Sequence, residues 1–487
     1  MRISSRAGAA LLSLALVAAC SKDDGTTGPV PGGLAVDSTR PTDGATAVPF
    51  VGRQLVYFDR ALDGLTVNGS TVGVLFPNSS PIPGPVEYDE TAHSAVMNLA
   101  LVPGVSYTGV VTVNVRGMDG ESLDSTYRWS FQTRTPARGL IDPTPGTGNV
   151  PQVGTDDAGV VHVTYADGAS GNLKYAQCAG GCVTPSNWST VVVANGVGTE
   201  SRIGLSVSPA GRVAISYYLT GPGALGVSVC DGACGIVGSW QSVVLEDQSG
   251  DVGFGASVAR GPNDALHVLF QDRDAETVRY TTCAASCGNA AGWSASAMID
   301  ASGIVGRVSS LAVAATGQIH AAWTDDSGSL IVYGGCVTNC TDPGAWSTAS
   351  LIASASATDR LQLVVDETNR PAVAFGIDNF VAVGLCVSTA CASDLSWAML
   401  LLTSDAVPDA AISLAVTEDR IHVAYARNNT EVRYLTCTSS CAASAAQWVG
   451  GSFDASTGAS DGAIAALPDG EPVMVVRRAA EGLAFLR

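Results

Sequence analysis

Six closely spaced pairs of cysteines are the side chains in this sequence with the clearest capacity for chemistry. In each pair three or four residues separate the cysteines, a tryptophan follows, and successive copies begin about fifty residues apart between Cys178 and Trp448. Two thiols at this spacing can form a local disulfide or supply two ligands to a metal ion. The pairs are Cys178/Cys182, Cys230/Cys234, Cys283/Cys287, Cys336/Cys340, Cys386/Cys391 and Cys437/Cys441.

The cysteine count favours disulfides over a metal site. The chain has 13 cysteines, and the only one outside the pairs is Cys20, so an exported, oxidising setting would give six local disulfides. A zinc site is the alternative. It needs four ligands in one place, whereas pairs on successive repeats are expected to lie apart around a ring. We therefore expect no metal and no cofactor.

The N-terminus has the pattern of a secretion signal. Two arginines precede a mostly apolar run, residues 9–19, that is too short to span a bilayer, which indicates a signal peptide over residues 1–19. The run ends in Val-Ala-Ala-Cys20 and resembles the lipobox of bacterial lipoproteins. This resemblance implies that Cys20 carries the lipid anchor, and that Ser21 directs the protein to the outer membrane. An ordinary cleaved signal with a chance cysteine is the alternative.

Composition limits the partners and the fold class. Residues 20–35 include SKDDGTTGPVPGG, and such a polar, Gly- and Pro-rich stretch is expected to be a flexible tether. The whole chain has 25 Lys and Arg against 44 Asp and Glu, a net charge of -19, which is the wrong sign for binding nucleic acid. The 55 glycines, the low charged content and the lack of helical periodicity indicate an all-β exported protein.

Residues 36–135 form the first predicted folded domain. About seven short alternating runs, separated by Gly, Pro, Asn and Asp turns, predict an antiparallel β-sandwich. The segment resembles the bacterial Ig-like domain of S-layer proteins and exported lipoproteins, and this resemblance implies a spacer or adhesion element. The stretches that carry it are PTDGATAVP at 41–49, VYFDRALD at 56–63, LVPGVSYTGVV at 101–111 and WSFQT at 129–133.

Residues 138–487 contain seven copies of a strand pair. The first copy is GVVHVTY followed by LKYAQC, and the seventh is EPVMVV followed by LAFLR. An upstream strand such as RIGLSV, and a strand after each tryptophan, bring each unit to four. Four strands repeated radially at this period predict a seven-bladed β-propeller, with one disulfide in each of six blades.

The last repeat is incomplete, and the sequence suggests how it is completed. The seventh unit stops at Arg487, before its fourth strand would begin. Alignment of the repeats places residues 140–142 on the fourth-strand segment 298–300. We therefore expect the segment around Leu140 to supply the outer strand of the last blade, which closes the ring and removes exposed strand edges.

Two repeated positions on the second strand of each unit are interpreted as core. Aromatic residues fill one of them in six copies and are expected to pack between blades; a ring for stacking sugars is the alternative. Histidine fills the other in four copies, and Ala or Val replaces it elsewhere, which favours a packed, hydrogen-bonded group over a metal ligand or a catalytic base. The aromatics are Tyr165, Tyr217, Phe270, Trp323, Phe375 and Tyr425, and the histidines are His162, His267, His320 and His422.

A ligand site is expected on the rim opposite the cysteine pairs. The candidates are charged residues near the starts of the inner strands, where they can point toward the central opening; solvated turn residues are the alternative interpretation. We nominate no catalytic residue, because glycosidase chemistry needs two carboxylates across one bond and no pair stands out. The candidate ligand-binding residues are Glu200, Arg202, Asp251, Arg307 and Arg360.

The strand pair H-V-x-Y and L-x-Y-x-x-C resembles the repeats of exported bacterial proteins related to sialidase and BNR-type propellers. The chain departs from that pattern, because it lacks the Asp-box and a coherent arginine triad with Tyr and Glu, so the resemblance does not imply activity. We expect a non-enzymatic envelope lipoprotein that binds the membrane through its anchor and recognises a polysaccharide or surface protein. The alternatives are a divergent glycan hydrolase or lyase acting at the central rim, and a purely structural envelope component.

Overall fold

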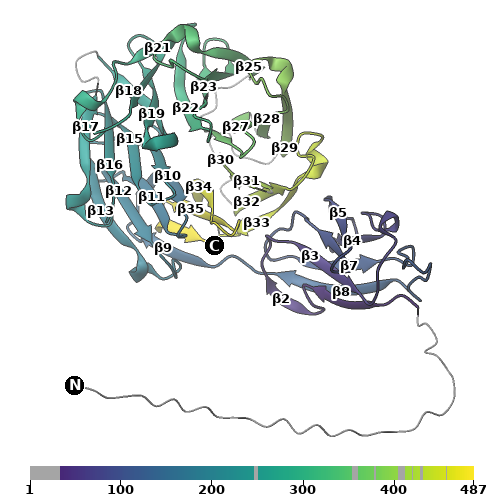
Figure 1. The fold of residues 1–487 in the computed structure, drawn as a ribbon. Coiled ribbons are helices and arrows are strands. Elements are labelled where there is room, and N and C mark those ends of the chain that lie inside the picture. Colours follow the sequence, from purple (N-terminus) through teal and green to yellow (C-terminus); the bar gives the residue numbers. More distant parts are fainter. Residues whose placement is uncertain are drawn as a thin grey trace, which may run out of the picture.

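The computed structural model describes residues 33–245, 250–353, 360–377, 380–403, 412–418, 420–427, 431–456 and 458–487. These residues form an all-β protein, in which the N-terminal sandwich and the propeller are both evident (Figure 1). The predicted signal peptide, Cys20 and most of the predicted tether lie outside the described residues. No helix in the described ranges is long and apolar enough to cross a bilayer.

The Ig-like domain consists of two four-stranded sheets with the orders β1-β3-β6-β5 and β2-β8-β7-β4. One pair differs from the expected antiparallel arrangement, because β2 runs parallel to β8. The reason is that the chain leaves the first sheet after β1, turns, and joins the second sheet as β2. The strands are β1 (Val36–Arg40), β2 (Ala45–Val48), β3 (Gln54–Phe58), β4 (Val72–Leu75), β5 (Val86–Asp89), β6 (Ser94–Met97), β7 (Ser106–Val111) and β8 (Tyr127–Thr133), and the 3-10 helix η1 spans Gly64–Thr66.

The sandwich has a core of its own, with no disulfide among the described residues of this domain. Trp129 is 2% exposed and lies directly across from Gly109 on the neighbouring strand. A Cβ at Gly109 would lie 2.1 Å from the indole ring, so this glycine makes room for the tryptophan. The hydroxyl of Tyr107 accepts the backbone N–H of Val102 at 2.9 Å, which satisfies a buried polar group.

Seven four-stranded sheets follow and confirm the predicted propeller (Figure 1). Blades 1 to 3 contain β10 (Thr147–Thr155), β11 (Val161–Asp167), β12 (Asn172–Cys178) and β13 (Ser189–Asn195); β14 (Gly204–Val207), β15 (Val213–Leu219), β16 (Ala224–Cys230) and β17 (Gln241–Leu245); and β18 (Val252–Arg260), β19 (Leu266–Asp272), β20 (Thr277–Cys283) and β21 (Ala297–Asp300). Blades 4 to 6 contain β22 (Val305–Val313), β23 (Ile319–Asp325), β24 (Leu330–Cys336) and β25 (Ser347–Ala353); β26 (Leu361–Val365), β27 (Pro371–Ile377), β28 (Phe380–Cys386) and β29 (Trp397–Thr403); and β30 (Ile412–Thr417), β31 (Arg420–Arg427), β32 (Glu431–Cys437) and β33 (Val449–Asp454).

Blade 7 is closed as the repeat alignment predicts. It consists of β34 (Ala459–Ala466), β35 (Pro472–Arg478), β36 (Gly482–Leu486) and, as its outer strand, β9 (Arg138–Asp142). Leu140 is the partner of Ala484 in this antiparallel pairing. The ring is therefore completed by segments from the two ends of the propeller. The other 3-10 helices are η2 (Pro185–Asn187), η3 (Val237–Ser239), η4 (Pro262–Asp264), η5 (Ala290–Gly292), η6 (Pro343–Ala345), η7 (Asp394–Ser396) and η8 (Ala445–Gln447).

All six predicted disulfides are formed, and each lies at the turn from the third strand of its blade to the fourth. They join Cys178 with Cys182, Cys230 with Cys234, Cys283 with Cys287, Cys336 with Cys340, Cys386 with Cys391 and Cys437 with Cys441. The Cα atoms of each pair are 5.7 or 5.8 Å apart, a separation that a disulfide spans without movement of the backbone.

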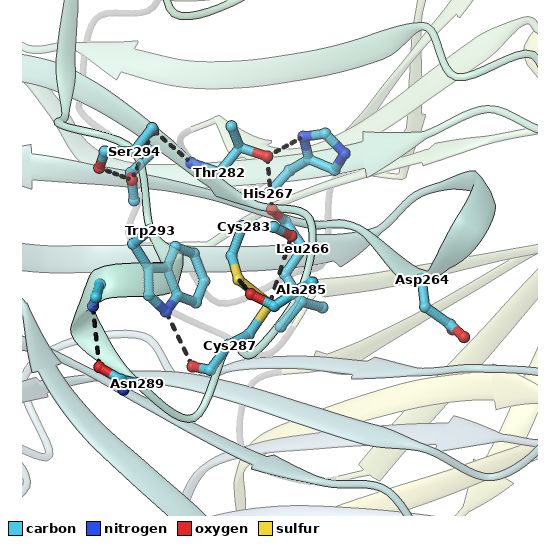
Figure 2. Close-up of a disulfide and its surroundings, with 12 residues drawn as sticks. Asp264, Leu266, His267, Thr282, Cys283, Ala285, Cys287, Asn289, Trp293 and Ser294 are labelled. Carbon is cyan, nitrogen blue, oxygen red and sulfur yellow. Dashed lines mark hydrogen bonds between the residues drawn. A yellow bond between two sulfur atoms is a disulfide. The ribbon is translucent and has the colours of Figure 1, made fainter.

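The tryptophan that follows each cysteine pair has a defined role. In blade 3 the indole Nε1 of Trp293 donates to the carbonyl oxygen of Cys287 at 2.9 Å (Figure 2). The other five tryptophans make the same bond to the second cysteine of their own pair. The spacing in the motif therefore encodes one compact loop.

The repeated histidines are hydrogen-bonded, as expected; three of the four are buried and His267 is partly buried. Nδ1 of His267 lies 2.6 Å from the hydroxyl of Tyr280 on the neighbouring strand. The same pairing joins His162 to Tyr175, His320 to Tyr333 and His422 to Tyr434. In blades 2 and 5, where alanine replaces the histidine, valine also replaces the tyrosine. The pair is thus exchanged as a unit, because either polar group alone would be buried without its partner.

The Ig-like domain packs directly on blades 6 and 7. Phe50 is fully buried, and its ring centroid lies 6.0 Å from those of Tyr434 and Phe453 in edge-on contacts. The side-chain oxygen of Asn98 accepts a hydrogen bond from Arg420 at 3.2 Å, and its backbone oxygen accepts one from Thr438 at 3.1 Å. The apolar residues of the two domains form one continuous cluster at this contact.

Candidate functional site

One arginine from blade 2 crosses the central opening of the propeller. Nη1 of Arg202 donates to the carbonyl oxygen of Ser309 in blade 4, at 3.2 Å, and to that of Leu361 in blade 5. A long side chain that ends in a planar group with several donors can join strands from distant parts of the ring. Arg202 therefore ties blade 2 to blades 4 and 5 across the channel.

A second contact across the channel joins blades 5, 7 and 1. Nη2 of Arg360 lies 2.9 Å from Oδ2 of Asp461, and the same oxygen accepts the backbone N–H of Val150 at 2.9 Å. Oδ1 of Asp461 accepts the N–H of Gly462 at 2.9 Å. Asp461 is 7% exposed. Both of its carboxylate oxygens thus already have donors within the protein.

The cavity between these side chains is small. Its volume is about 20 Å³, and Gln152, Gln362 and Ser413 contribute to its lining; this is room for about one water molecule. Burial, and to a smaller degree the charge of Arg360, lower the pKa of Arg202 to about 10, with Asp461 acting in the opposite direction. The guanidinium stays charged at neutral pH. The cavity between Arg202, Arg360 and Asp461 is too small to hold a sugar ring.

The other three predicted ligand-binding residues do not join this cluster. Nε of Arg307 pairs with Asp326 at 2.8 Å within blade 4, and the side chain of Glu200 is exposed. Asp251 accepts the hydroxyl of Tyr218 at 2.7 Å and also pairs with Arg273 at 3.0 Å. The structure therefore brings Arg202 and Arg360 together at the channel and leaves Glu200, Asp251 and Arg307 apart from them.

The surroundings of Asp251 form a closed cluster. The guanidinium carbon of Arg273 lies 4.7 Å from the ring centroid of Phe254, and the ring of Tyr218 meets Phe254 edge-on at 5.5 Å. Both aromatic residues are buried. The face of Phe254 is thus covered by a cation–π contact, and this cluster presents no bare ring on which a sugar could stack.

Asp461 and the polar residues on the inner strands were not among the predicted site residues. A side chain on one inner strand accepts the backbone N–H of the next, as Ser257 does from Leu311 at 3.0 Å and Asp461 from Val150. Ser310, Gln362 and Ser413 accept in the same way from blades 5, 6 and 7. The sequence does contain a polar residue in the first strand of several blades. That these side chains accept backbone N–H groups follows only from knowing which first strands are neighbours around the ring.

Two larger cavities lie on the disulfide face, where the first strand turns into the second and the third into the fourth. One, of about 690 Å³, lies between blades 5 and 6, and the other, of about 640 Å³, lies between blades 7 and 1. Between blades 6 and 7 the Ig-like domain fills the corresponding place, through Asn98 and its contacts to Arg420 and Thr438. The open grooves thus flank the Ig-like domain, on the face opposite the predicted rim.

Three of the six disulfides lie away from both grooves. Cys386, Cys437 and Cys441 line the first groove and Cys182 the second, whereas the disulfides Cys230–Cys234, Cys283–Cys287 and Cys336–Cys340 contribute to neither lining. In each of these three, the carbonyl oxygen of the second cysteine accepts the indole N–H of the tryptophan in its own loop. We therefore interpret these disulfides as cross-links of the outer hairpin and not as parts of a ligand site.

Several solved structures are similar to this chain at low identity. They include AofleA from Arthrobotrys oligospora, with 11% identity, 73% of this chain and 87% of that chain covered and a TM-score of 0.41. An ulvan lyase described as a new family of polysaccharide lyase has 11% identity, 71% and 94% coverage and a TM-score of 0.48. The intramolecular trans-sialidase from Ruminococcus gnavus has 10% identity, 69% and 93% coverage and a TM-score of 0.39.

These identities and scores leave the function to be argued from the residues of this chain. No curated protein matches it. The N-terminal part does match a described family: residues 32–133 match the bacterial Ig-like domain, which agrees with the sandwich of β1 to β8.

Proposed function

We propose that this protein is an exported lipoprotein of the bacterial cell envelope whose propeller is a non-enzymatic binding or scaffold domain for a polysaccharide or protein. Residues 1–19 act as the signal peptide, Cys20 carries the lipid, and residues 20–35 tether the folded part to the outer membrane. The six disulfides support an oxidising location. The Ig-like domain positions the propeller relative to the tether.

The observation that carries the non-enzymatic assignment is the state of the channel. Hydrolysis of a glycoside uses a pair of carboxylic acids on either side of the bond. Among the described residues that line the central cavity, Asp461 is the only carboxylate, and Arg360 and two backbone N–H groups occupy its oxygens. A general acid or nucleophile needs an oxygen that faces the substrate, and Asp461 has none to offer.

The decisive experiment incubates the soluble ectodomain, residues 35–487, with envelope and extracellular polysaccharides and with envelope proteins. Retention on immobilised ectodomain and release of new reducing ends or unsaturated products are both scored. We expect retention without release. Release that is lost in an Asp461→Asn variant would instead establish a hydrolase or lyase at the central rim.

The lipid anchor is tested separately on the full chain. Expression with an alkyne-labelled fatty acid should label the wild-type protein and place it in the outer-membrane fraction. The Cys20→Ala variant should remain unlabelled. Equal labelling of both proteins would remove the anchor from the proposal.

A further inference from the structure

In blades 2, 4 and 6 the residue at the start of the second strand reaches across to a neighbouring element. Arg212 of blade 2 pairs with Asp264 of blade 3. Gln318 of blade 4 accepts the side-chain amide of Asn369 of blade 5 at 2.7 Å. Arg420 of blade 6 donates to Asn98 of the Ig-like domain. The residue at this position therefore links blade 2 to blade 3, blade 4 to blade 5, and blade 6 to the Ig-like domain.

Blade 5 differs from these three blades. Its residue at the same position is Arg370, whose side chain is exposed and makes no hydrogen bond or ion pair with any described residue. Arg370 lies at the edge of the groove of about 690 Å³ between blades 5 and 6, which we name the 5/6 groove. Asp366, Glu367 and Glu418 line the same groove, and none of them pairs with the Arg370 guanidinium. Its five N–H donors therefore remain for a partner that carries an acceptor.

The floor of the 5/6 groove is aliphatic. Leu385, Val416 and Ile421 contribute to it, together with Val387, which is 50% exposed. The histidine of the repeat is replaced here by Ala372, which also lines the groove and leaves more room than an imidazole would. No aromatic side chain belongs to the described lining. An aliphatic floor without rings favours the side chains of a polypeptide over the stacked faces of sugars.

The protein itself contains an example of such a partner at the next groove. There the segment that begins at Asn98 supplies an acceptor to Arg420, and four residues further along Val102 lies against Gly451, where an added Cβ would be 3.0 Å from the valine. The 5/6 groove is continuous with this interface, because Arg420 and Thr438 line it as well. Arg370 thus occupies in one groove the place that Arg420 occupies in the next.

We propose that the 5/6 groove is a docking site for an extended protein segment in which an Asp, Glu or Asn side chain is followed by aliphatic residues. The acceptor binds Arg370 and the aliphatic side chains cover the exposed part of Val387 and the groove floor. This inference rests on the proposed binding function and specifies a polypeptide as the partner.

The test uses a fluorescent synthetic peptide with the sequence of residues 94–104, SAVMNLALVPG, and a second peptide with Asp in place of its Asn. Anisotropy measures binding to the ectodomain, residues 35–487. We expect both peptides to bind, and Arg370→Ala to weaken binding about tenfold, which is about 1.4 kcal/mol. Val387→Glu should weaken binding as well, since it places a charge on the aliphatic floor.

Arg212→Ala is the matched control. It removes an arginine from the equivalent position of blade 2, where the side chain already pairs with Asp264 of blade 3. It should bind the peptides like the wild type, and circular dichroism should show that all three variants are folded. Binding that is equal in the Arg370, Val387 and wild-type proteins, or no binding, overturns the proposed site. Retention of a polysaccharide that depends on Arg370 would also overturn it, while leaving the binding function intact; release of reducing ends would refute that function separately.

Discussion

Blade 3 and blade 7 have the same four strands in the same order but are held together in different ways. Blade 3 is a continuous segment whose outer turn is cross-linked by Cys283–Cys287 and covered by Trp293 (Figure 2). Blade 7 has no cysteine and takes its outer strand β9 from a position more than 300 residues earlier in the chain. A local covalent bond secures the first, and non-local strand pairing secures the second.

The difference shows that the hairpins and the ring are stabilised by different interactions. A disulfide across a short loop limits the unfolded chain only locally, so six of them stabilise six hairpins without closing the ring. Closure depends on β9, which pairs with β36, and on two backbone hydrogen bonds between Ala137 and Arg487 at 2.6 and 3.0 Å. We therefore expect the weakest point for opening of the propeller to lie within blade 7, where β9 pairs with β36.

The largest effect is expected from weakening β9. Ile141 is 6% exposed and packs in the same apolar cluster as Phe485, so Ile141→Ala should lower the free energy of unfolding by about 3 kcal/mol. Ile299 is the equivalent residue in blade 3 and is only partly buried. Ile299→Ala should therefore cost clearly less. Urea unfolding of both variants, followed by tryptophan fluorescence, measures the two losses, and equal losses would contradict a special role for the closing strand.

A smaller effect is expected from removing one cross-link. Replacement of Cys283 and Cys287 by serine should lower the free energy of unfolding by about 2 kcal/mol, from the entropy of closing a short loop. The hydrogen bond from Trp293 to the carbonyl of residue 287 does not need the sulfur and should persist, which the native fluorescence spectrum can report. An unchanged urea midpoint would show that packing alone holds the hairpin.

The smallest expected effect is a pH dependence of stability that arises from His267 in blade 3. Blade 2 lacks it, because Ala214 stands at the equivalent position. Burial lowers the pKa of His267 from 6.5 to about 4. Its contribution to stability is therefore complete above pH 6.5 and is lost as the pH falls toward 4, because the unfolded chain takes up a proton that the folded protein excludes. Between about pH 7 and about pH 4.5, the free energy of unfolding of the His267→Gln variant should fall less steeply with decreasing pH than that of the wild type. The two slopes should differ by no more than the uptake of one proton.

Tyr280→Phe is the control for this titration. It removes the hydroxyl partner of His267 but keeps the buried imidazole, so it should lower stability at every pH and leave the slope in place. If His267→Gln leaves the slope unchanged as well, the histidine is not the group that titrates.

Much of the propeller could be predicted because its determinants are repeated and local. The spacing of Cys178, Cys182 and Trp188 encodes one loop, and six copies specify six such loops. The missing fourth strand of the last repeat followed from counting strands, since an unpaired edge has to be satisfied. The pairing of His162 with Tyr175 was also visible as a joint exchange across repeats, although only the histidine had been singled out.

The candidate sites could be predicted less well. Arg202 and Arg360 were selected because they precede inner strands, and they do reach the channel. That Arg202 spans from blade 2 to blades 4 and 5 depends on the diameter of the closed ring, which no local pattern records. Asp461 was overlooked because its partners come from blades 1 and 5.

The repeat pattern was enough to specify the number of blades, the position of each disulfide and the segment that closes the ring, because each of these depends on short-range spacing that recurs many times. Three other features became visible with the closed fold: Arg202, Arg360 and Asp461 meet across the central channel, the Ig-like domain packs against blade 6 through Phe50, and the groove beside Arg370 stays open. These features depend on which distant side chains meet once the ring has closed, and the same arginine at an equivalent repeat position can face a carboxylate, another domain or solvent.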